Sequence, residues 1–180
     1  MKILAFGGSS STKSINKQLA TYTTTLFETG EIEILDLNDF EMPLFSVDKE
    51  ALSGFPSEAH NFLQKISQTD VLIISLAEHN GSYSVAFKNI LDWASRIDGK
   101  VFQNKPMLLM ATSDGRRGGK SVLEAAMSRF PFMGGNIIST FSLPEFNKNF
   151  SKNQGILDTE LKNELLQAID NIVKYKKEHS

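Results

Sequence analysis

The sequence predicts an α/β domain built on a parallel β-sheet that helices cover on both faces. Short apolar runs of strand length alternate five times with segments in which apolar residues recur at helical spacing. Two runs, VLIISL at 71–76 and PMLLMAT at 106–112, are apolar on both faces, which is typical of central strands between two helical layers. Strands that alternate with helices imply a parallel sheet with right-handed crossovers. We therefore expect a single domain over residues 1–180.

The individual elements follow from the same pattern. Strands are expected at 2–6, 31–36, 71–76, 106–112 and 136–139. Apolar stripes predict helices within 15–26, 59–66, 87–94, 122–130 and 161–172, and Asp158 is the expected N-cap of the last one. The segments 40–56 and 143–155 have no clear period and are expected to be loops.

Composition excludes several classes of protein. Hydrophobic residues make up 41% and charged residues 22% of the 180, which is ordinary for a globular domain. The formal net charge of −2 gives no basic field for nucleic acid, and the absence of cysteine excludes thiol catalysis and disulfides. No apolar run approaches the roughly 20 residues that a membrane span needs. We expect a cytoplasmic protein with no nucleic-acid or membrane partner and no metal site.

In sheets of this kind ligands bind outside the carboxyl ends of the strands, so the loops that follow the strands are where a site is expected. The loop after the first strand, GGSSSTKSIN at 7–16, combines glycines, hydroxyl side chains, a lysine and a helix start. Hydroxyls, free backbone N–H groups and the helix dipole all favour an anion. The loop therefore predicts a monophosphate site, and a serine-rich helix cap with nothing bound is the alternative.

Two later loops have unusual chemistry. The third strand ends in AEHNGS at 77–82, where an ordinary connection needs only turn formers. The loop after the fourth strand, TSDGRRGGKS at 112–121, ends like a P-loop, but Asp114 stands where that motif requires its first glycine. This loop has three interpretations: a nucleoside triphosphate site, a donor-rich loop around a flat polar ligand, or a glycine-rich helix start.

Together the three loops resemble the NADPH-dependent FMN reductase family, which includes azoreductases, chromate reductases and quinone reductases. The family motif G-S-x-R-x-x-S-x-N corresponds to 8–16, P-E-Y-N-G-S followed by K-N-x-x-D-W corresponds to 77–82 and 88–93, and S-x-G-G-x-G-G corresponds to 113–119. Here Ser11 replaces the motif arginine, Ala77 the proline, His79 the tyrosine and Arg116 a glycine. The resemblance covers nearly the whole chain.

The resemblance implies a flavodoxin-like fold with strand order 2-1-3-4-5 and a non-covalently bound FMN. NADPH or NADH would deliver hydride to the flavin, and a small acceptor would receive the electrons: a quinone, an azo compound, free flavin or a metal oxyanion. Because the flavin supplies the chemistry, no catalytic side chain is expected. The implied cofactor-binding residues are Ser9, Ser11, Lys13, Ser14, Ile15, Asn16, Glu78, His79, Asn80, Gly81, Ser82, Ser113, Asp114, Gly115, Arg116, Gly118 and Gly119.

Some roles stay open at this point. His79 is either a ring beside the flavin or a proton donor to a reduced quinone or azo nitrogen. Glu78 is a flavin neighbour, a cap or a general base, and Phe87 and Trp93 are core or subunit contacts. The resemblance also implies a homodimer or tetramer in which neighbouring subunits complete the flavin pocket. The alternatives to a reductase are a non-catalytic FMN carrier or sensor and, more distantly, a P-loop nucleotidase.

Overall fold

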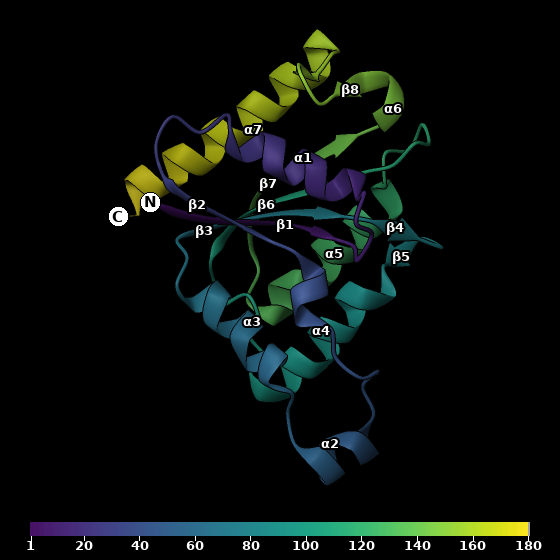
Figure 1. The fold of residues 1–180 in the computed structure, drawn as a ribbon. Helices are drawn as coiled ribbons and strands as arrows, with labels where there is room; N and C mark the ends of the chain where they lie inside the picture. The colour runs from purple at the N-terminus through teal and green to yellow at the C-terminus, as the bar shows by residue number, and fades with distance from the viewer. Residues whose placement is uncertain (180) are drawn as a thin grey trace.

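The computed structural model describes residues 1–179, so Ser180, the last residue of the expected domain, lies outside the described residues. Its central sheet is parallel and has the order β2-β1-β3-β6-β7, which confirms the predicted order of the five strands (Figure 1). The strands are β1 Lys2–Gly8, β2 Glu31–Leu35, β3 Val71–Leu76, β6 Pro106–Thr112 and β7 Asn136–Leu143. The predicted bounds of β3 and β6 are confirmed, whereas β7 extends four residues beyond the predicted end because Thr140–Leu143 continue to pair with β6.

Helices cover both faces of this sheet, as the apolar stripes predict. The helices α1 Ile15–Thr24 and α7 Thr159–Glu178 lie on one face, and α3 Ser57–Ser67, α4 Val85–Ile97 and α5 Lys120–Arg129 lie on the other (Figure 1). Two separate clusters of buried side chains result, one under each layer. The fully buried strands β3 and β6 contribute alternate residues to both clusters.

Local signals fix several helix starts. Ser84 accepts a hydrogen bond from the N–H of Phe87 and caps α4. Asp158 accepts from the N–H of Leu161 at 2.9 Å, which confirms it as the N-cap of α7. Both contacts provide an acceptor for a first-turn N–H group, which has no hydrogen-bond partner within its own helix.

Short elements within the segments expected to be loops were not predicted. The first such segment holds α2 Val47–Ser53 after the 3₁₀ turn η1 Leu37–Phe40, and α2 projects from the body of the molecule (Figure 1). The second holds α6 Phe146–Asn149 and the hairpin of β8 Phe150–Ser151 with β9 Gly155–Ile156. A further 3₁₀ turn, η2 Phe130–Met133, follows α5. These elements are too short to show a period in sequence.

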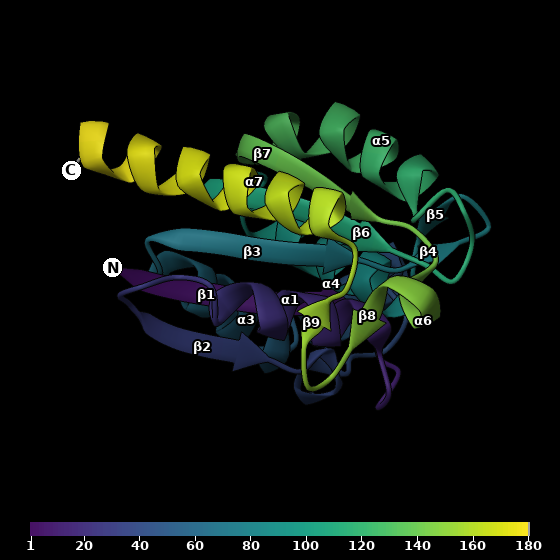
Figure 2. The same ribbon diagram turned by 90° about the horizontal axis from the view of Figure 1, so that it is seen from above.

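The parallel strands bring the ends of β1, β3 and β6 to one edge of the sheet, where α1, α4 and α5 begin (Figure 2). The three loops singled out by their chemistry therefore meet there. Among residues 1–179 no helix is both long and apolar enough to cross a membrane.

Candidate flavin-binding site

A cavity of about 340 Å³ opens at this edge between the loops that follow β1, β3 and β6. It is small but lies within the range of roughly 300–1,000 Å³ that is usual for ligand sites. Residues from all three loops line it: Ser9, Ser11, Lys13, Ser14, Ile15, Asn16, Ala77, Glu78, His79, Thr112, Ser113 and Asp114. Three distant segments of sequence thus form one site.

The first loop is shaped by its serines. The Ser9 hydroxyl oxygen accepts from the N–H of Ser11 at 3.1 Å, and the Ser11 oxygen accepts from the N–H of Lys13 at 3.3 Å. Each oxygen is used as an acceptor, so each hydroxyl proton is left to donate. The loop therefore presents O–H donors to the cavity.

The start of α1 adds further donors. Ser14 caps the helix by accepting from the N–H of Lys17 at 3.1 Å. The N–H groups of Ile15 and Asn16, in the first turn, have no preceding helical carbonyl to accept them. Lys13 is exposed and lines the same cavity. A set of O–H and N–H donors with one cation is the chemistry that binds phosphate.

The side chain of Asn16, which lines the same cavity, is hydrogen-bonded to the sheet. Its side-chain oxygen accepts from the N–H of Thr112 at 3.0 Å and from the Ser75 hydroxyl at 2.7 Å, while its amide donates to the Thr112 carbonyl at 3.1 Å. All three contacts are buried. The side chain therefore joins α1 to β3 and β6 and positions the first loop. Asn16 also lines the cavity, so the phosphate contact expected from the sequence stays a prediction, with its backbone N–H as the donor.

The segment after β3 forms a small hairpin that sequence reasoning missed. Strand β4 Glu78–His79 pairs with β5 Ser82–Tyr83 through a turn at Asn80 and Gly81, whose φ angles are +52° and +76°. An Asn-Gly pair between two strands favours this mirror-image turn, so the dipeptide was the signal. The hairpin places His79, which is exposed, at the mouth of the cavity.

Both ends of the hairpin are fastened to α5 and its surroundings. The Glu78 carboxylate accepts from the N–H groups of Ser121 at 3.1 Å and Val122 at 3.2 Å, which confirms its interpretation as a cap. At the other end Tyr83 stacks on Phe130, and burial raises the pKa of its hydroxyl. The hairpin is therefore held against α5.

The same contact removes the P-loop interpretation. A nucleoside triphosphate would need free N–H groups at the start of α5, but the Glu78 carboxylate accepts from those of Ser121 and Val122. The Lys120 N–H donates to the Arg117 carbonyl at 3.0 Å. A second anion there would meet a like charge. The loop after β6 is therefore not a triphosphate cradle.

The first residues of the loop after β6 line the cavity, and its later glycines pack against the sheet. Ser113 and Asp114 line the cavity, and Asp114 accepts from the side-chain amide of Asn147 at 2.6 Å. Gly118 has φ +57°, and a Cβ there would lie 2.5 Å from the Ser142 hydroxyl oxygen. Gly119 is similarly tight against the Ala111 side chain. These two glycines serve packing between the loop and the sheet.

Ten of the seventeen residues expected to bind the cofactor line the cavity. Ala77 and Thr112 also line it and were not among them. Seven do not line it: Asn80, Gly81, Ser82, Gly115, Arg116, Gly118 and Gly119. Arg116 instead lies at a separate groove beside β7. Phe87 and Trp93 are fully buried in the core, and Trp93 donates to the Pro43 carbonyl at 2.8 Å.

A parallel sheet of this order with a phosphate-type cradle after its first strand defines a flavodoxin-like protein. The chain belongs to the NADPH-dependent FMN reductase family, whose model matches residues 1–148. It is 34% identical over 119 residues to an NAD(P)H-dependent FMN reductase of Pseudomonas aeruginosa, covering 66% of this chain and 63% of the relative. It is 38% identical over 120 residues to a 2-hydroxy-1,4-benzoquinone reductase of a Burkholderia species, with coverage of 66% and 63%. These matches span less than two thirds of each relative's length.

Solved structures agree on the fold. The flavoenzyme FerB, an NAD(P)H:(acceptor) oxidoreductase from Paracoccus denitrificans, superposes with a TM-score of 0.79 at 22% identity. The superposition covers 99% of this chain and 98% of that one. The likeness extends through α7, beyond the residues that the family model matches.

Proposed function

We propose that this chain is an FMN-dependent NAD(P)H oxidoreductase that passes electrons through its flavin to a small acceptor. The acceptor classes are quinones, azo compounds, free flavins and metal oxyanions. The observation that carries the proposal is the junction of a phosphate-type cradle with two further loops at one sheet edge, in a chain of this family. The lack of cysteine suits the cytoplasm, where we place it.

The residues present fit FMN. The O–H groups of Ser9, Ser11 and Ser14 and the first-turn N–H groups of α1 would hold the phosphate, and Lys13 would add a positive charge. The cavity then leads between the hairpin after β3 and the Ser113–Asp114 backbone, which would flank the ring. The three hydrogen bonds of the Asn16 side chain to Thr112 and Ser75, here called the Asn16 clamp, hold the loop after β1 in place beside the loop after β6.

When bound, the flavin supplies reversible acceptance and donation of hydride or electrons. The protein's part is to bind and orient it, and backbone N–H groups near the ring would stabilise the negative charge of the reduced form. His79 is at the open mouth of the cavity, where it would pack beside the ring or meet the acceptor. Glu78 would act by holding the hairpin, since its carboxylate is engaged by α5.

We also propose that the chain forms a homodimer through the α2 region. Apolar side chains of Leu44, Val47, Leu52 and Val85 are 62–87% exposed around this projecting segment. A patch of this kind on a soluble protein is typical of a subunit contact. The segment is attached firmly, because Asn89 bonds to the backbone of Met42, Pro43 and Phe45.

The test has two stages. Purified protein saturated with FMN and then desalted should remain yellow, and anaerobic NADPH should bleach it rapidly. Loss of all chromophore on desalting would contradict the proposal. Retained flavin with slow or absent bleaching would favour the FMN carrier instead.

The phosphate end can be tested on its own. Lys13→Ala and Ser14→Ala should each weaken FMN by roughly five- to tenfold, the loss expected for one charge-assisted hydrogen bond. Neither should change the affinity for riboflavin, which lacks the phosphate. Equal losses for both ligands would place the phosphate elsewhere.

A further inference from the structure

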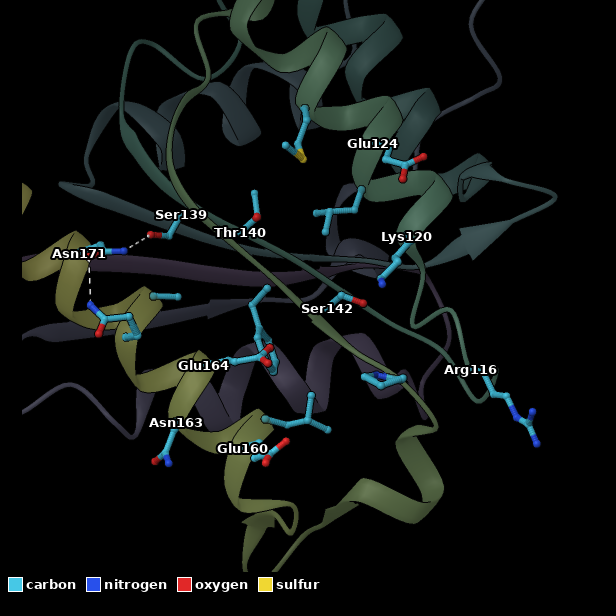
Figure 3. Close-up of a pocket in the computed structure, with 17 residues that line it drawn as sticks. Arg116, Lys120, Glu124, Ser139, Thr140, Ser142, Glu160, Asn163, Glu164 and Asn171 are labelled. Atoms are coloured by element: carbon cyan, nitrogen blue, oxygen red, sulfur yellow. Dashed lines mark hydrogen bonds between the residues drawn. The ribbon is translucent and has the colours of Figure 1, made fainter.

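A second and larger hollow, a groove of about 1220 Å³, follows the outer edge of β7 (Figure 3). Residues 139–142 of β7 form its floor, and α5 and α7 form its two walls. None of the residues that line the cofactor cavity lines this groove, and the proposed function does not use it. The α7 wall also lies beyond residues 1–148, which the family model matches. Neither the cofactor nor the family model therefore accounts for the groove.

The floor of the groove is a strand edge without a partner. Among residues 1–179 β7 pairs with β6 alone, so alternate residues turn their backbone N–H and C=O groups away from β6 and toward the groove. Residues 139–142 pair with β6 without interruption, because the irregularity in this register lies before Ser139. A regular open edge of this kind is a template on which another strand can form.

This edge also lacks the protection that the other edge of the sheet has. β7 reads NIISTFSL, with neither a charge nor a proline, and Thr140 is exposed. At the opposite edge β2 reads EIEIL, and its Glu31 and Glu33 pair with lysines. Because open strand edges are normally blocked by charge or proline, the bare edge of β7 is suited to receive a strand.

The side chains of the floor show which way the side chains of an added strand would point. Ser139 accepts a hydrogen bond from the Asn171 amide of α7 at 3.1 Å. The Ser142 hydroxyl instead donates to the Gly118 carbonyl, just before α5, at 3.0 Å. Side chains alternate between the two faces of a sheet. Those of an added strand would therefore face the α5 wall and the α7 wall in turn.

The two walls carry opposite charge near the starts of both helices (Figure 3). Arg116 precedes α5 and Lys120 is its first residue, while Glu160 and Glu164 lie one helical turn apart in α7. Among residues 1–179 none of these four side chains forms an ion pair. A cation at the start of a helix is opposed by the helix dipole, so Lys120 does not stabilise α5. These charges are available to a ligand.

Farther along both helices the walls lose this contrast in charge. Leu123 and Met127 of α5 are apolar, and Met127 is 46% exposed. Opposite them α7 presents the amides of Gln167 and Asn171. Glu124, between the two zones, reduces the positive charge of the α5 wall without cancelling it. A ligand that fits the whole groove is thus charged at one end and largely uncharged at the other.

We propose that this groove binds an extended peptide segment of another protein, which adds to β7 as a sixth strand of the sheet. At one end the segment turns acidic side chains toward the cations of the α5 wall. At the alternate positions it turns basic side chains toward the carboxylates of the α7 wall. At its other end the side chains are apolar toward α5 and polar toward α7. Main-chain hydrogen bonds to residues 139–142 supply affinity, and the walls supply specificity.

Synthetic peptides test the proposal on the FMN-loaded protein. The peptide VTVKEKE, acetylated and amidated at its ends, has valines and glutamates on one face and threonine and lysines on the other. The peptide EKEKVTV offers the same pattern to a strand of the opposite direction. At least one of them should bind with a dissociation constant of about 100 µM or lower in isothermal titration calorimetry. No binding by either peptide would overturn the proposal.

Strand addition also requires that only alternate backbone groups of the peptide meet the edge of β7. Two versions of the binding peptide, one methylated on the odd amide nitrogens and one on the even, should therefore differ. One should lose about tenfold or more in affinity, and the other should lose little. Hydrogen exchange of residues 139–142 should slow when the unmethylated peptide binds, while that of β2 should not. Equal losses for the two versions, or unchanged exchange in β7, would overturn the proposal.

Charge reversal tests the walls. Glu160→Lys with Glu164→Lys makes both walls basic, so the binding peptide should lose about tenfold or more in affinity. A version of that peptide with glutamate in place of both lysines should instead bind this variant more tightly than it binds the wild type. Circular dichroism shows whether the variant is folded, and Glu160→Gln with Glu164→Gln, a milder change, should also weaken the original peptide.

The matched control for charge reversal is Asp170→Lys with Glu178→Lys. It makes the same charge change on α7 outside the groove and should leave the affinity of the original peptide unchanged. Equal affinities of that peptide for the wild type and for the folded variant with two basic walls would overturn the proposal. So would an equal loss in the control, because the effect would then come from net charge alone.

Peptide binding and the proposed reductase activity can fail independently. None of the carboxylates changed in these variants lines the cofactor cavity, so each variant should retain FMN as the wild type does. Loss of flavin by the wild type would refute the proposed function, and the peptide titrations can still be made on the protein without FMN. A protein that retains FMN and is reduced by NADPH, yet binds neither peptide, would refute the groove proposal alone.

Discussion

The Glu78 carboxylate and the Ser121 backbone N–H are joined by a 3.1 Å hydrogen bond that links the loop after β3 to the start of α5. The same oxygen accepts from the Val122 N–H at 3.2 Å, so one side chain satisfies two amides at a helix start. A carboxylate there is also favoured by the helix dipole. Through this contact the position of the His79-bearing hairpin depends on α5.

Replacing Glu78 should loosen the hairpin and the helix start together. Glu78→Ala should lower the free energy of unfolding by about 1–2 kcal/mol, the usual loss for a helix cap. Glu78→Gln keeps an acceptor oxygen without the charge, so it should lose about half as much. Urea denaturation at pH 7 measures both. Asp170→Asn, which changes an exposed carboxylate on α7, is the control and should leave the unfolding free energy unchanged.

The Asn16 clamp should be among the most sensitive polar sites. Asn16→Ala leaves the Thr112 N–H and carbonyl buried without their partner, and the cost should be about 2–4 kcal/mol. A double-mutant cycle with Ser75→Ala isolates the bond between the two side chains. Its coupling energy should be about 1 kcal/mol. Strictly additive losses in urea denaturation would show that this bond contributes nothing.

The sheet was predictable because its signals are local. The runs 71–76 and 106–112 are apolar throughout, and their ends coincide with β3 and β6. β7 was harder to delimit, because its last residues alternate polar and apolar and become a strand only by pairing with β6. α2 has no buried residue at all, so no apolar stripe could reveal it.

The site was predictable as a set of loops but not as a set of contacts. Sequence placed Ser9, Lys13 and Ser14 at a phosphate-type cradle, and the structure brings them to one cavity. It did not show that Asn16 turns inward to Thr112, because that bond joins residues 96 positions apart. The position of Arg116 could not be predicted, because a charged residue in a glycine-rich loop can lie on either side of the loop. It lies at the groove beside β7 and not at the cofactor cavity.

Gly7 should tolerate no side chain. A Cβ on it would overlap the Lys17 backbone nitrogen and lie 2.9 Å from the Asn16 carbonyl carbon, so α1 would have to move. Gly7→Ala should therefore cost about 1–3 kcal/mol in urea denaturation and also weaken FMN, since the cradle moves with the helix. Gly99→Ala is the control, because a Cβ on Gly99 would have no neighbouring atom within 4 Å. It should be neutral or slightly stabilising.

The pH dependence of stability should depend in part on Asp36, at the end of β2. The Lys17 ammonium donates to its carboxylate at 2.5 Å and the Asn38 N–H donates at 3.0 Å, and these bonds lower the pKa of Asp36 below 3.8, the Lys17 bond most. A carboxyl whose pKa is lower in the folded state stabilises the fold above its unfolded pKa, and that contribution disappears as the pH falls through the folded pKa. Asp36→Asn should therefore be less stable than wild type at pH 7, by roughly 0.5–1 kcal/mol because the pair is partly exposed.

The difference in unfolding free energy between Asp36→Asn and wild type should shrink below pH 3.8 and not between pH 5 and 7. Urea denaturation across this range measures it, with Asp39→Asn on the same turn as control. A constant difference down to the acid limit would show that the loss arises from packing and not from the carboxylate.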